Sequence, residues 1–137
     1  FTAAFPRTGT AHKTVPDVTL LMRELRSQLD TLGAANRRHY YLTIATPTGR
    51  WQYGGAYDPS DSYDLAAIAR IADWLNVMTY DMNNIFSPYS AFNAPLHEDP
   101  KDPTPVAQRK WNNVSAAVRY YERHGGPAGK IVLGMAF

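Results

Sequence analysis

A tyrosine and an aspartate, Tyr80 and Asp81, end the apolar run WLNVMTYD at residues 74–81. Burying an ionised carboxylate without a partner is costly, so an aspartate at the end of a buried strand needs a structural or a chemical reason. Alternate side chains of a strand point to opposite faces, so Asn76, Met78 and Tyr80 share one face. A phenol beside a carboxylate at such an end could bind a small polar ligand. The structural alternative makes Tyr80 a core residue with a satisfied hydroxyl and Asp81 a helix cap or loop anchor.

Other kinds of chemistry find little support in the composition. The chain has no cysteine, which excludes disulfides and thiol catalysis, and its four histidines lack the spacing of metal ligands, so we expect no metal site. Its net charge of +2 comes from scattered Lys and Arg, which predicts no nucleic-acid partner. No apolar stretch approaches the ~20 residues that cross a bilayer, so we expect no membrane partner. The segment Gly125–Lys130 lacks the order and spacing of a phosphate-binding loop, and no cofactor is expected.

Three short, nearly continuous apolar runs predict buried strands that are covered on both faces, at residues 40–46, 74–81 and 130–137. Apolar residues at helical spacing predict three helices, at about residues 16–32, 65–72 and 112–124. The first helix has a capping-box pattern at Thr14 to Asp17, and Gly33 is expected to end it. The elements therefore alternate between helix and strand along the whole chain.

This alternation predicts right-handed βαβ units and a parallel sheet, which is an α/β fold. Two long loops, at residues 47–61 and 82–110, follow the C-terminal ends of the first two strands. Ligands of α/β proteins bind at that edge of the sheet. The two loops contain six aromatic residues: Trp51, Tyr53, Tyr57, Phe86, Tyr89 and Phe92. These rings either cover the top of the sheet or stack on a sugar or a base, and the sequence leaves both alternatives open.

The strand that ends in Tyr80 and Asp81 resembles the sixth barrel strand of family-18 glycoside hydrolases, the chitinases and their relatives, where Met, Tyr and Asp have this spacing. Further resemblances follow in the family's order. The sequence Asn93-Ala94-Pro95-Leu96 resembles the short motif of the next loop, and residues 130–137 resemble the seventh strand. Residues 41–47 resemble the fifth strand, and the leucine-rich first helix resembles the fourth helix. The resemblance covers nearly the whole chain.

The resemblance implies part of a (β/α)8 TIM barrel, with about three parallel strands and three helices that resemble barrel strands five to seven. Complete barrels have about 250 residues, so residues 1–137 are expected to form one partial catalytic domain. In the family, the proton-donating glutamate precedes an aromatic residue and a proline, a pair that Phe5-Pro6 resembles. The position of the glutamate then falls on Ala4 and that of the preceding aspartate on Thr2, so the general acid is not recognisable in this chain. Either the acid has been lost by substitution, or residues 1–4 are not the native approach to this motif.

For the function, the resemblance implies cleavage of β-1,4-linked N-acetylglucosamine by a substrate-assisted retaining mechanism, in which the acetamido oxygen of the substrate attacks the anomeric carbon. The implied catalytic residues are Tyr80, which donates a hydrogen bond to the acetamido group, and Asp81, which holds the group and balances its positive charge. Met78 would shape the pocket floor, and further substrate contacts are expected from Trp51, Tyr53 and Met135. The expected partner is chitin or an N-acetylglucosamine oligosaccharide.

Two other functions stay open on the sequence. The same barrel without its acid would be a lectin that binds chitin oligosaccharides, and a chain complete in itself would be a small three-stranded α/β domain without a sugar function. For the hydrolase, we expect the isolated chain to be inactive and the parent protein to be secreted. The unpaired edges of a three-stranded piece of a barrel predict self-association of the isolated chain.

Overall fold

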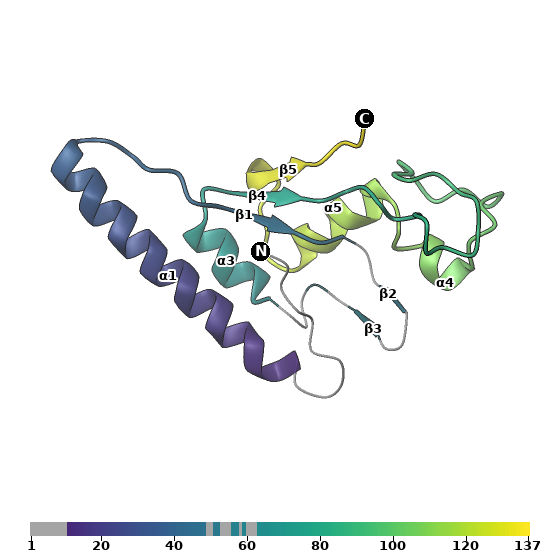
Figure 1. Cartoon of the computed structure of the whole chain (residues 1–137), viewed down its shortest axis with the longest axis horizontal. Helices are drawn as coiled ribbons and strands as arrows, with labels where there is room; N and C mark the ends of the chain where they lie inside the picture. The colour runs from purple at the N-terminus through teal and green to yellow at the C-terminus, as the bar shows by residue number, and fades with distance from the viewer. Residues whose placement is uncertain (1–10, 49–50, 53–55, 58, 60–62) are drawn as a thin grey trace.

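The computed structural model describes residues 11–48, 51–52, 56–57, 59 and 63–137 (Figure 1). Its helices are α1 (Ala11–Asn36), α3 (Leu65–Ile71), α4 (Val106–Arg109) and α5 (Val114–Arg123), with a short 3-10 helix, η1, at Ala128–Lys130. Its strands are β1 (Thr43–Thr46), β2 (Trp51–Gln52), β3 (Ala56–Tyr57), β4 (Trp74–Val77) and β5 (Ile131–Leu133). Within this described part, no helix is both long and apolar enough to cross a membrane.

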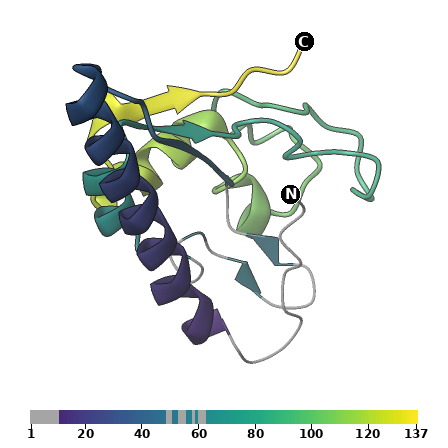
Figure 2. The same ribbon diagram turned by 60° about the vertical axis from the view of Figure 1, so that its left-hand side comes forward.

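Three of the strands form a parallel sheet in the order β1-β4-β5. In its register, Ile44 pairs with Leu75, which pairs with Ile131 on the other side. Helix α3 lies between β1 and β4 in the chain, and α5 lies between β4 and β5, so two βαβ units build the sheet. Figures 1 and 2 show the long helices on one side of the sheet and all three strands pointing toward the loop that follows β4. The predicted parallel α/β fold is therefore confirmed.

The core lies between the sheet and helices α3 and α5. Leu75 of β4, Ile68 of α3 and Tyr121 of α5 are all 0% exposed. Full burial of one aliphatic side chain of this size stabilises a fold by about 1.5–3 kcal/mol. The hydroxyl of Tyr121 also donates a hydrogen bond of 2.6 Å to the carbonyl oxygen of Pro47. The core and this bond together hold α5 against the C-terminal end of β1.

A charged cluster closes the opposite, N-terminal edge of the sheet. The Asp73 carboxylate accepts a hydrogen bond of 2.7 Å from the Leu42 N–H, and it contacts His39 Nε2 at 2.7 Å and Arg26 Nη1 at 3.3 Å. Burial by itself raises the pKa of Asp73, but the Leu42 N–H, His39 and Arg26 outweigh it, so the net pKa lies below the usual value. The ionised carboxylate thereby links α1 and the start of β1 to the start of β4.

Helix α1 differs from its prediction at both ends. The predicted helix covers residues 16–32, whereas α1 runs from Ala11 to Asn36, so the predicted capping box lies inside the helix and is wrong. Gly33 does not end the helix. A glycine is required here because the chain folds back on this position, and a Cβ would clash with the carbonyl oxygen of Arg38. The helix ends where Arg37 adopts a left-handed φ of 53°.

The strands are shorter than predicted. Strand β4 ends at Val77 instead of residue 81, β5 ends at Leu133 instead of residue 137, and β1 begins at Thr43 instead of residue 40. The apolar runs continue into the adjoining loops, so composition alone does not locate the ends. The loop after β1 also contains an antiparallel hairpin, β2–β3, that the pattern does not predict. As a result, Tyr80 and Asp81 lie just beyond β4, in the β4–α4 loop (residues 78–105).

Candidate functional site

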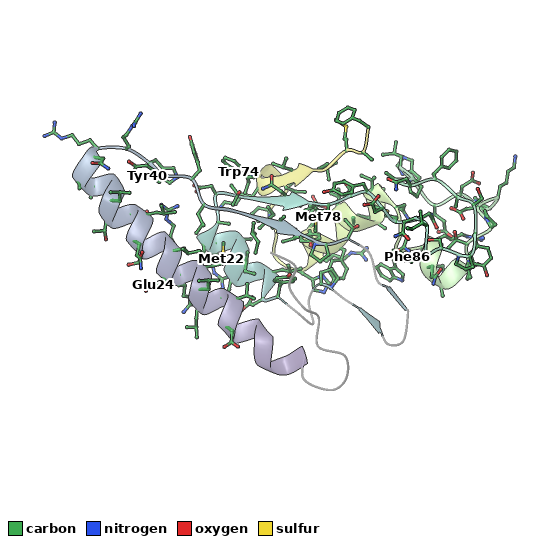
Figure 3. All side chains as sticks on the ribbon, viewed as in Figure 1. Met22, Glu24, Tyr40, Trp74, Met78 and Phe86 are labelled. Atoms are coloured by element: carbon green, nitrogen blue, oxygen red, sulfur yellow. The ribbon has the colours of Figure 1, made fainter. Side chains whose placement is uncertain are left out.

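Side chains of β4 and of the residues after it alternate between two faces of the sheet. The buried set is Leu75, Val77 and Thr79. The partly exposed set is Asn76, Met78 and Tyr80. This agrees with the prediction that the second set shares one face, although Met78 and Tyr80 follow the last residue of the strand. Figure 3 shows Met78 at the end of β4, with Phe86 farther out along the β4–α4 loop.

The ring of Tyr80 lies against the chain that follows β5. A Cβ at Gly134 would stand 2.6 Å from Tyr80 Cε1, so a glycine is needed for the ring to approach this closely. The Gly134 N–H donates to the Val77 carbonyl oxygen at 2.8 Å, and its own carbonyl oxygen accepts from Thr79 Oγ1 at 2.6 Å. In the described part of the chain, the Tyr80 hydroxyl has no hydrogen-bond partner. Tyr80 therefore differs from the core tyrosine of the structural alternative, whose hydroxyl would be satisfied.

Asp81 combines an unusual backbone with an exposed carboxylate. Its φ of 57° lies in the left-handed region, which costs a non-glycine residue roughly 1–2 kcal/mol. Asn93 contacts it twice: Asn93 Oδ1 accepts from the Asp81 N–H at 3.1 Å, and Asn93 Nδ2 donates to Asp81 Oδ1 at 2.8 Å. Asn84 Nδ2 donates to the Asp81 carbonyl oxygen at 3.0 Å. Asp81 Oδ2 accepts no hydrogen bond from a described residue, so this oxygen is available to a ligand.

The Asn93-Ala94-Pro95-Leu96 motif connects this carboxylate to helix α5. The carbonyl oxygens of its last two residues accept hydrogen bonds from the first two N–H groups of α5, at 2.9 and 3.0 Å. Asn113, which is 1% exposed, caps the same helix, since its Oδ1 accepts from the Ala116 N–H at 2.8 Å. The N–H groups in the first turn of α5 are thus all hydrogen-bonded. These bonds fix the position of the motif relative to the helix.

The other predicted substrate-binding residues are distributed around this edge of the sheet. The Met78 N–H donates to the Thr46 carbonyl oxygen at 2.9 Å, which holds Met78 beside the end of β1. Met135 follows β5 and is 72% exposed. Trp51 begins β2, but its side chain and the whole of Tyr53 lie outside the described residues. The same holds for the residues on which the general-acid prediction depends, Thr2, Ala4, Phe5 and Pro6.

Exposed rings and a cleft occupy the β4–α4 loop. Phe86 is 82% exposed and Phe92 is 74% exposed, so these rings do not cover the sheet. A cleft of about 430 Å³ opens beside Phe92, and Asp99 and Lys101 line it too. The covering alternative therefore does not hold for Phe86 and Phe92, whereas the side chains of Trp51, Tyr53 and Tyr57 lie outside the described residues. Among the residues that the structure describes, no group of His, Asp and Glu side chains could hold a metal ion.

Sequence reasoning missed two contributions to this site. It recognised the motif that begins at Asn93 without connecting it to Asp81, and it gave Gly134 no role. For Asn93 a signal existed, because both residues lie in one loop and an asparagine amide can both donate and accept. For Gly134 the sequence offers only a glycine inside an apolar run, which indicates a close approach without naming the neighbour.

A family model described as Glycosyl hydrolases family 18 matches residues 8–137. The chain belongs to this family. Among curated members, Chitinase A1 of Niallia circulans is 39% identical over 120 residues, which are 87% of this chain and 16% of that protein. Chitinase 1 of Aphanocladium album is 32% identical over 121 residues, which are 87% of this chain and 26% of that protein. The resemblance found in the sequence is therefore confirmed.

Solved structures of related proteins contain the same fold as this family-18 chain. Chitinase ChiA74 from Bacillus thuringiensis matches with a TM-score of 0.79 and 31% identity, over 96% of this chain and 20% of that chain. A family-18 N-acetylglucosaminidase from Paenibacillus barengoltzii matches with a TM-score of 0.75 and 29% identity, over 96% of this chain and 37% of that chain. The Group IV chitinase of Ostrinia furnacalis in complex with allosamidin matches with a TM-score of 0.75 and 27% identity, over 96% and 32%. The chain thus spans 16% to 37% of the length of these relatives and has the fold of part of a barrel.

Proposed function

We propose that this family-18 chain is one section of the (β/α)8 barrel of a hydrolase that cleaves β-1,4-linked N-acetylglucosamine. In this proposal Tyr80 and Asp81 bind the acetamido group of the sugar. The observation that carries it is a half-buried phenol, unpartnered in the described fold, next to an exposed carboxylate that Asn93 holds. Both lie at the C-terminal edge of the sheet, where (β/α)8 barrels bind their ligands.

The proposed mechanism is substrate-assisted and retaining, which makes it an exception to the scheme of two protein carboxylates. The acetamido oxygen attacks the anomeric carbon while the bond to the leaving oxygen breaks, and the resulting oxazolinium ion is later opened by water. The Tyr80 hydroxyl donates a hydrogen bond that fixes the acetamido group for attack. The Asp81 carboxylate balances the positive charge that develops on this group. One preorganised partner of this kind is typically worth ~3–4 kcal/mol.

The leaving oxygen also needs a proton, and three of the described carboxylates already have structural roles. Asp64 caps α3 by accepting from the Ala67 N–H, Asp73 lies at the opposite edge of the sheet, and Glu98 pairs with Arg109 at 3.2 Å. In our proposal the acid comes from a part of the longer protein other than these 137 residues. The isolated chain of 137 residues is therefore expected to be inactive.

The exposed rim supports a polymeric sugar as the substrate. Phe86 and Phe92 present rings on which pyranose rings can stack, and Met78 would form the floor beneath the acetamido group. Trp51, Tyr53 and Met135 remain proposed contacts farther along the polymer. The related Ostrinia furnacalis chitinase has been solved with allosamidin, which makes this compound a reasonable probe. Because chitin is an insoluble polymer, we propose that the protein acts outside the cell.

A lectin is the second candidate function. It would use the same barrel and the same Tyr80 and Asp81 contacts to bind chitin oligosaccharides without cutting them. The observation that favours it is Ala4, which stands where the family's glutamate is expected. Binding without turnover would distinguish the lectin from the hydrolase.

The test is Tyr80→Phe in the full-length polypeptide that contains these 137 residues. We expect kcat/KM for a chromogenic chitobiose substrate to fall about 100- to 1,000-fold, because one preorganised donor is lost. The melting temperature should hardly change, since the hydroxyl bonds to no described residue. Tyr41→Phe is the control, because Tyr41 is a 67% exposed tyrosine just before β1, at the opposite edge of the sheet, and it should leave both quantities unchanged.

Three results would decide against parts of the proposal. Full activity of Tyr80→Phe would contradict the role of the phenol. A wild-type protein that binds chitotriose in calorimetry but does not cleave it would be the lectin. A wild-type protein that neither binds nor cleaves chitin oligosaccharides would contradict both candidate functions.

A further inference from the structure

The contacts of Asn93 point to a role beyond closing a loop. We propose that Asn93 is a positioning residue that turns the Asp81 carboxylate toward the ligand, by occupying Asp81 Oδ1 and leaving Oδ2 free. This inference rests on the proposed role of Asp81 in sugar binding. It adds a residue that contacts no sugar itself and acts only through Asp81.

The two bonds between Asn93 and Asp81 do different things. The bond of 3.1 Å from the Asp81 N–H to Asn93 Oδ1 holds the backbone in its left-handed conformation, with φ at 57°. The bond of 2.8 Å from Asn93 Nδ2 to Asp81 Oδ1 fixes the rotation of the carboxylate. Both come from one planar amide group. The backbone and the carboxylate of Asp81 are therefore fixed relative to each other.

Asn93 is itself held by the surrounding fold. Its carbonyl oxygen accepts from the Met82 N–H at 2.9 Å, and its Nδ2 also approaches the Asn83 carbonyl oxygen at 3.2 Å. Asn83, which is 8% exposed, donates from its Nδ2 to the Phe92 carbonyl oxygen at 3.0 Å. The residues just after Asn93 bind the first turn of α5. The orientation of Asp81 is thus set before a ligand arrives, which is the condition for preorganised catalysis.

An amide is suited to orienting the Asp81 carboxylate because it is uncharged. It donates to the carboxylate without cancelling its negative charge, whereas a lysine or arginine in its place would compete with the positive charge on the sugar. Asp81 therefore keeps its charge for the acetamido group. The contact with Asn93 decides only the direction in which the free oxygen points.

The test is Asn93→Asp in the full-length polypeptide. This change keeps the Oδ1 acceptor for the Asp81 N–H and replaces the Nδ2 donor by an oxygen, so that two carboxylates face each other. At neutral pH the two carboxylates repel, and we expect kcat/KM on the chitobiose substrate to fall about 10- to 100-fold, as for a misplaced catalytic group. At acid pH one proton shared between the carboxylates restores a donor, so the ratio of wild-type to variant kcat/KM should shrink as the pH falls.

Asn36→Asp is the control. Asn36 is also an exposed asparagine whose Nδ2 donates a hydrogen bond, to the Tyr40 hydroxyl at 2.9 Å, but it ends α1 near the opposite edge of the sheet. The control thus makes the same change of an amide to a carboxylate away from Asp81, and we expect less than a twofold change in kcat/KM at every pH.

A loss that is the same at every pH, or equal in the two variants, would overturn the inference and leave Asn93 a purely structural residue. Two further readouts need no turnover. Calorimetry should show weaker allosamidin binding to Asn93→Asp than to Asn36→Asp at neutral pH, and equal binding would overturn the inference. In NMR spectra, the side-chain amide signals of Asn93 should shift in Asp81→Ala and stay in place in Asp30→Ala, and Asn93 signals that do not shift in Asp81→Ala would also overturn the inference. If these signals shift while the wild-type protein neither binds nor cleaves, the proposed function fails and the Asn93 contact stands.

Discussion

At the scale of single residues, the site depends on partners that lie far along the chain. The Tyr80 ring fits in its place only because residue 134 has no side chain. The Asp81 carboxylate is oriented by a hydrogen bond from the side-chain amide of Asn93. Neither partner has a charge or a reactive group. Their contribution is geometric, because they decide where a phenol and a carboxylate point. Residues of this kind are tested best by small changes of shape.

Gly134→Ala is expected to displace the Tyr80 ring. Its Cβ would stand 2.6 Å from Tyr80 Cε1 and 3.1 Å from the Val77 carbonyl oxygen, so the ring must move. Overpacking of this kind lowers the free energy of unfolding by about 1–3 kcal/mol, and we expect the Kd for chitotriose to rise at least about tenfold. Urea unfolding and calorimetry on the full-length polypeptide measure these two effects.

Gly129→Ala is the control for this substitution, because a Cβ at Gly129 would meet no atom within 4 Å. It should change neither the free energy of unfolding nor the Kd. An unchanged Kd in Gly134→Ala would show that the position of the Tyr80 ring does not matter for the ligand.

At the scale of elements, the two edges of the sheet have separate tasks. The C-terminal edge carries the long loops and the proposed site. The N-terminal edge carries contacts that hold helices to strands: Asp73 with Arg26, and Lys130 Nζ, which donates to the carbonyl oxygens of Ala69 and Ala72 at 2.8 and 2.7 Å. Lys130 thereby caps the C-terminus of α3, which agrees with excluding a phosphate-binding role for its glycine-rich segment. In (β/α)8 barrels this division separates stability from chemistry.

Asp73→Asn is expected to reduce stability in a pH-dependent way. The pKa of Asp73 is lowered in the fold, so its contribution is fully present above its usual pKa of 3.8 and is lost as the pH falls through the lower folded value. Near neutral pH the variant should lose about 2 kcal/mol of unfolding free energy, since hydrogen bonds to a charged group are weakened. The difference from the wild type should shrink as the pH falls below 3.8.

Urea unfolding across a pH series measures this difference. Asp30→Asn is the control, because Asp30 also pairs with Arg26, at 2.7 Å, but its side chain is 62% exposed. We expect it to change the unfolding free energy by less than about 1 kcal/mol. A loss in Asp73→Asn that does not vary with pH would mean that the charge of Asp73 is unimportant.

At the scale of the whole molecule, the described chain exposes apolar side chains that would be more stable if another protein segment packed on them. Along α1, Met22 is buried in the core, whereas Leu21, Leu25 and Leu32 are 58%, 39% and 47% exposed. Strands β1 and β5 are the two edges of the sheet, and Val132 of β5 is 46% exposed. Since the chain spans at most 37% of the relatives compared above, we propose that further barrel segments cover these surfaces.

The isolated chain of 137 residues is therefore expected to self-associate. Sedimentation velocity over a range of concentrations should show a rising mean mass. Val132→Lys, which puts a charge on an edge strand, should reduce the association. Ser27→Lys adds the same charge at a polar, exposed position of α1 and should not reduce it. A monodisperse monomer with a high melting temperature would contradict the picture of a partial barrel.

The sequence by itself determined the three strands of the parallel sheet, their pairing and the family, because apolar runs and short motifs are local features of the sequence. It did not determine their burial, since Val132 of β5 is 46% exposed. It also indicated that Tyr80 and Asp81 come at the end of the central strand. Only the tertiary structure decided that β4 ends at Val77, that the Asn93 amide hydrogen-bonds to Asp81, and that the absence of a side chain at Gly134 lets the Tyr80 ring pack there. These contacts depend on strand register and on the path of a long loop, which join residues distant in sequence and leave no periodic trace.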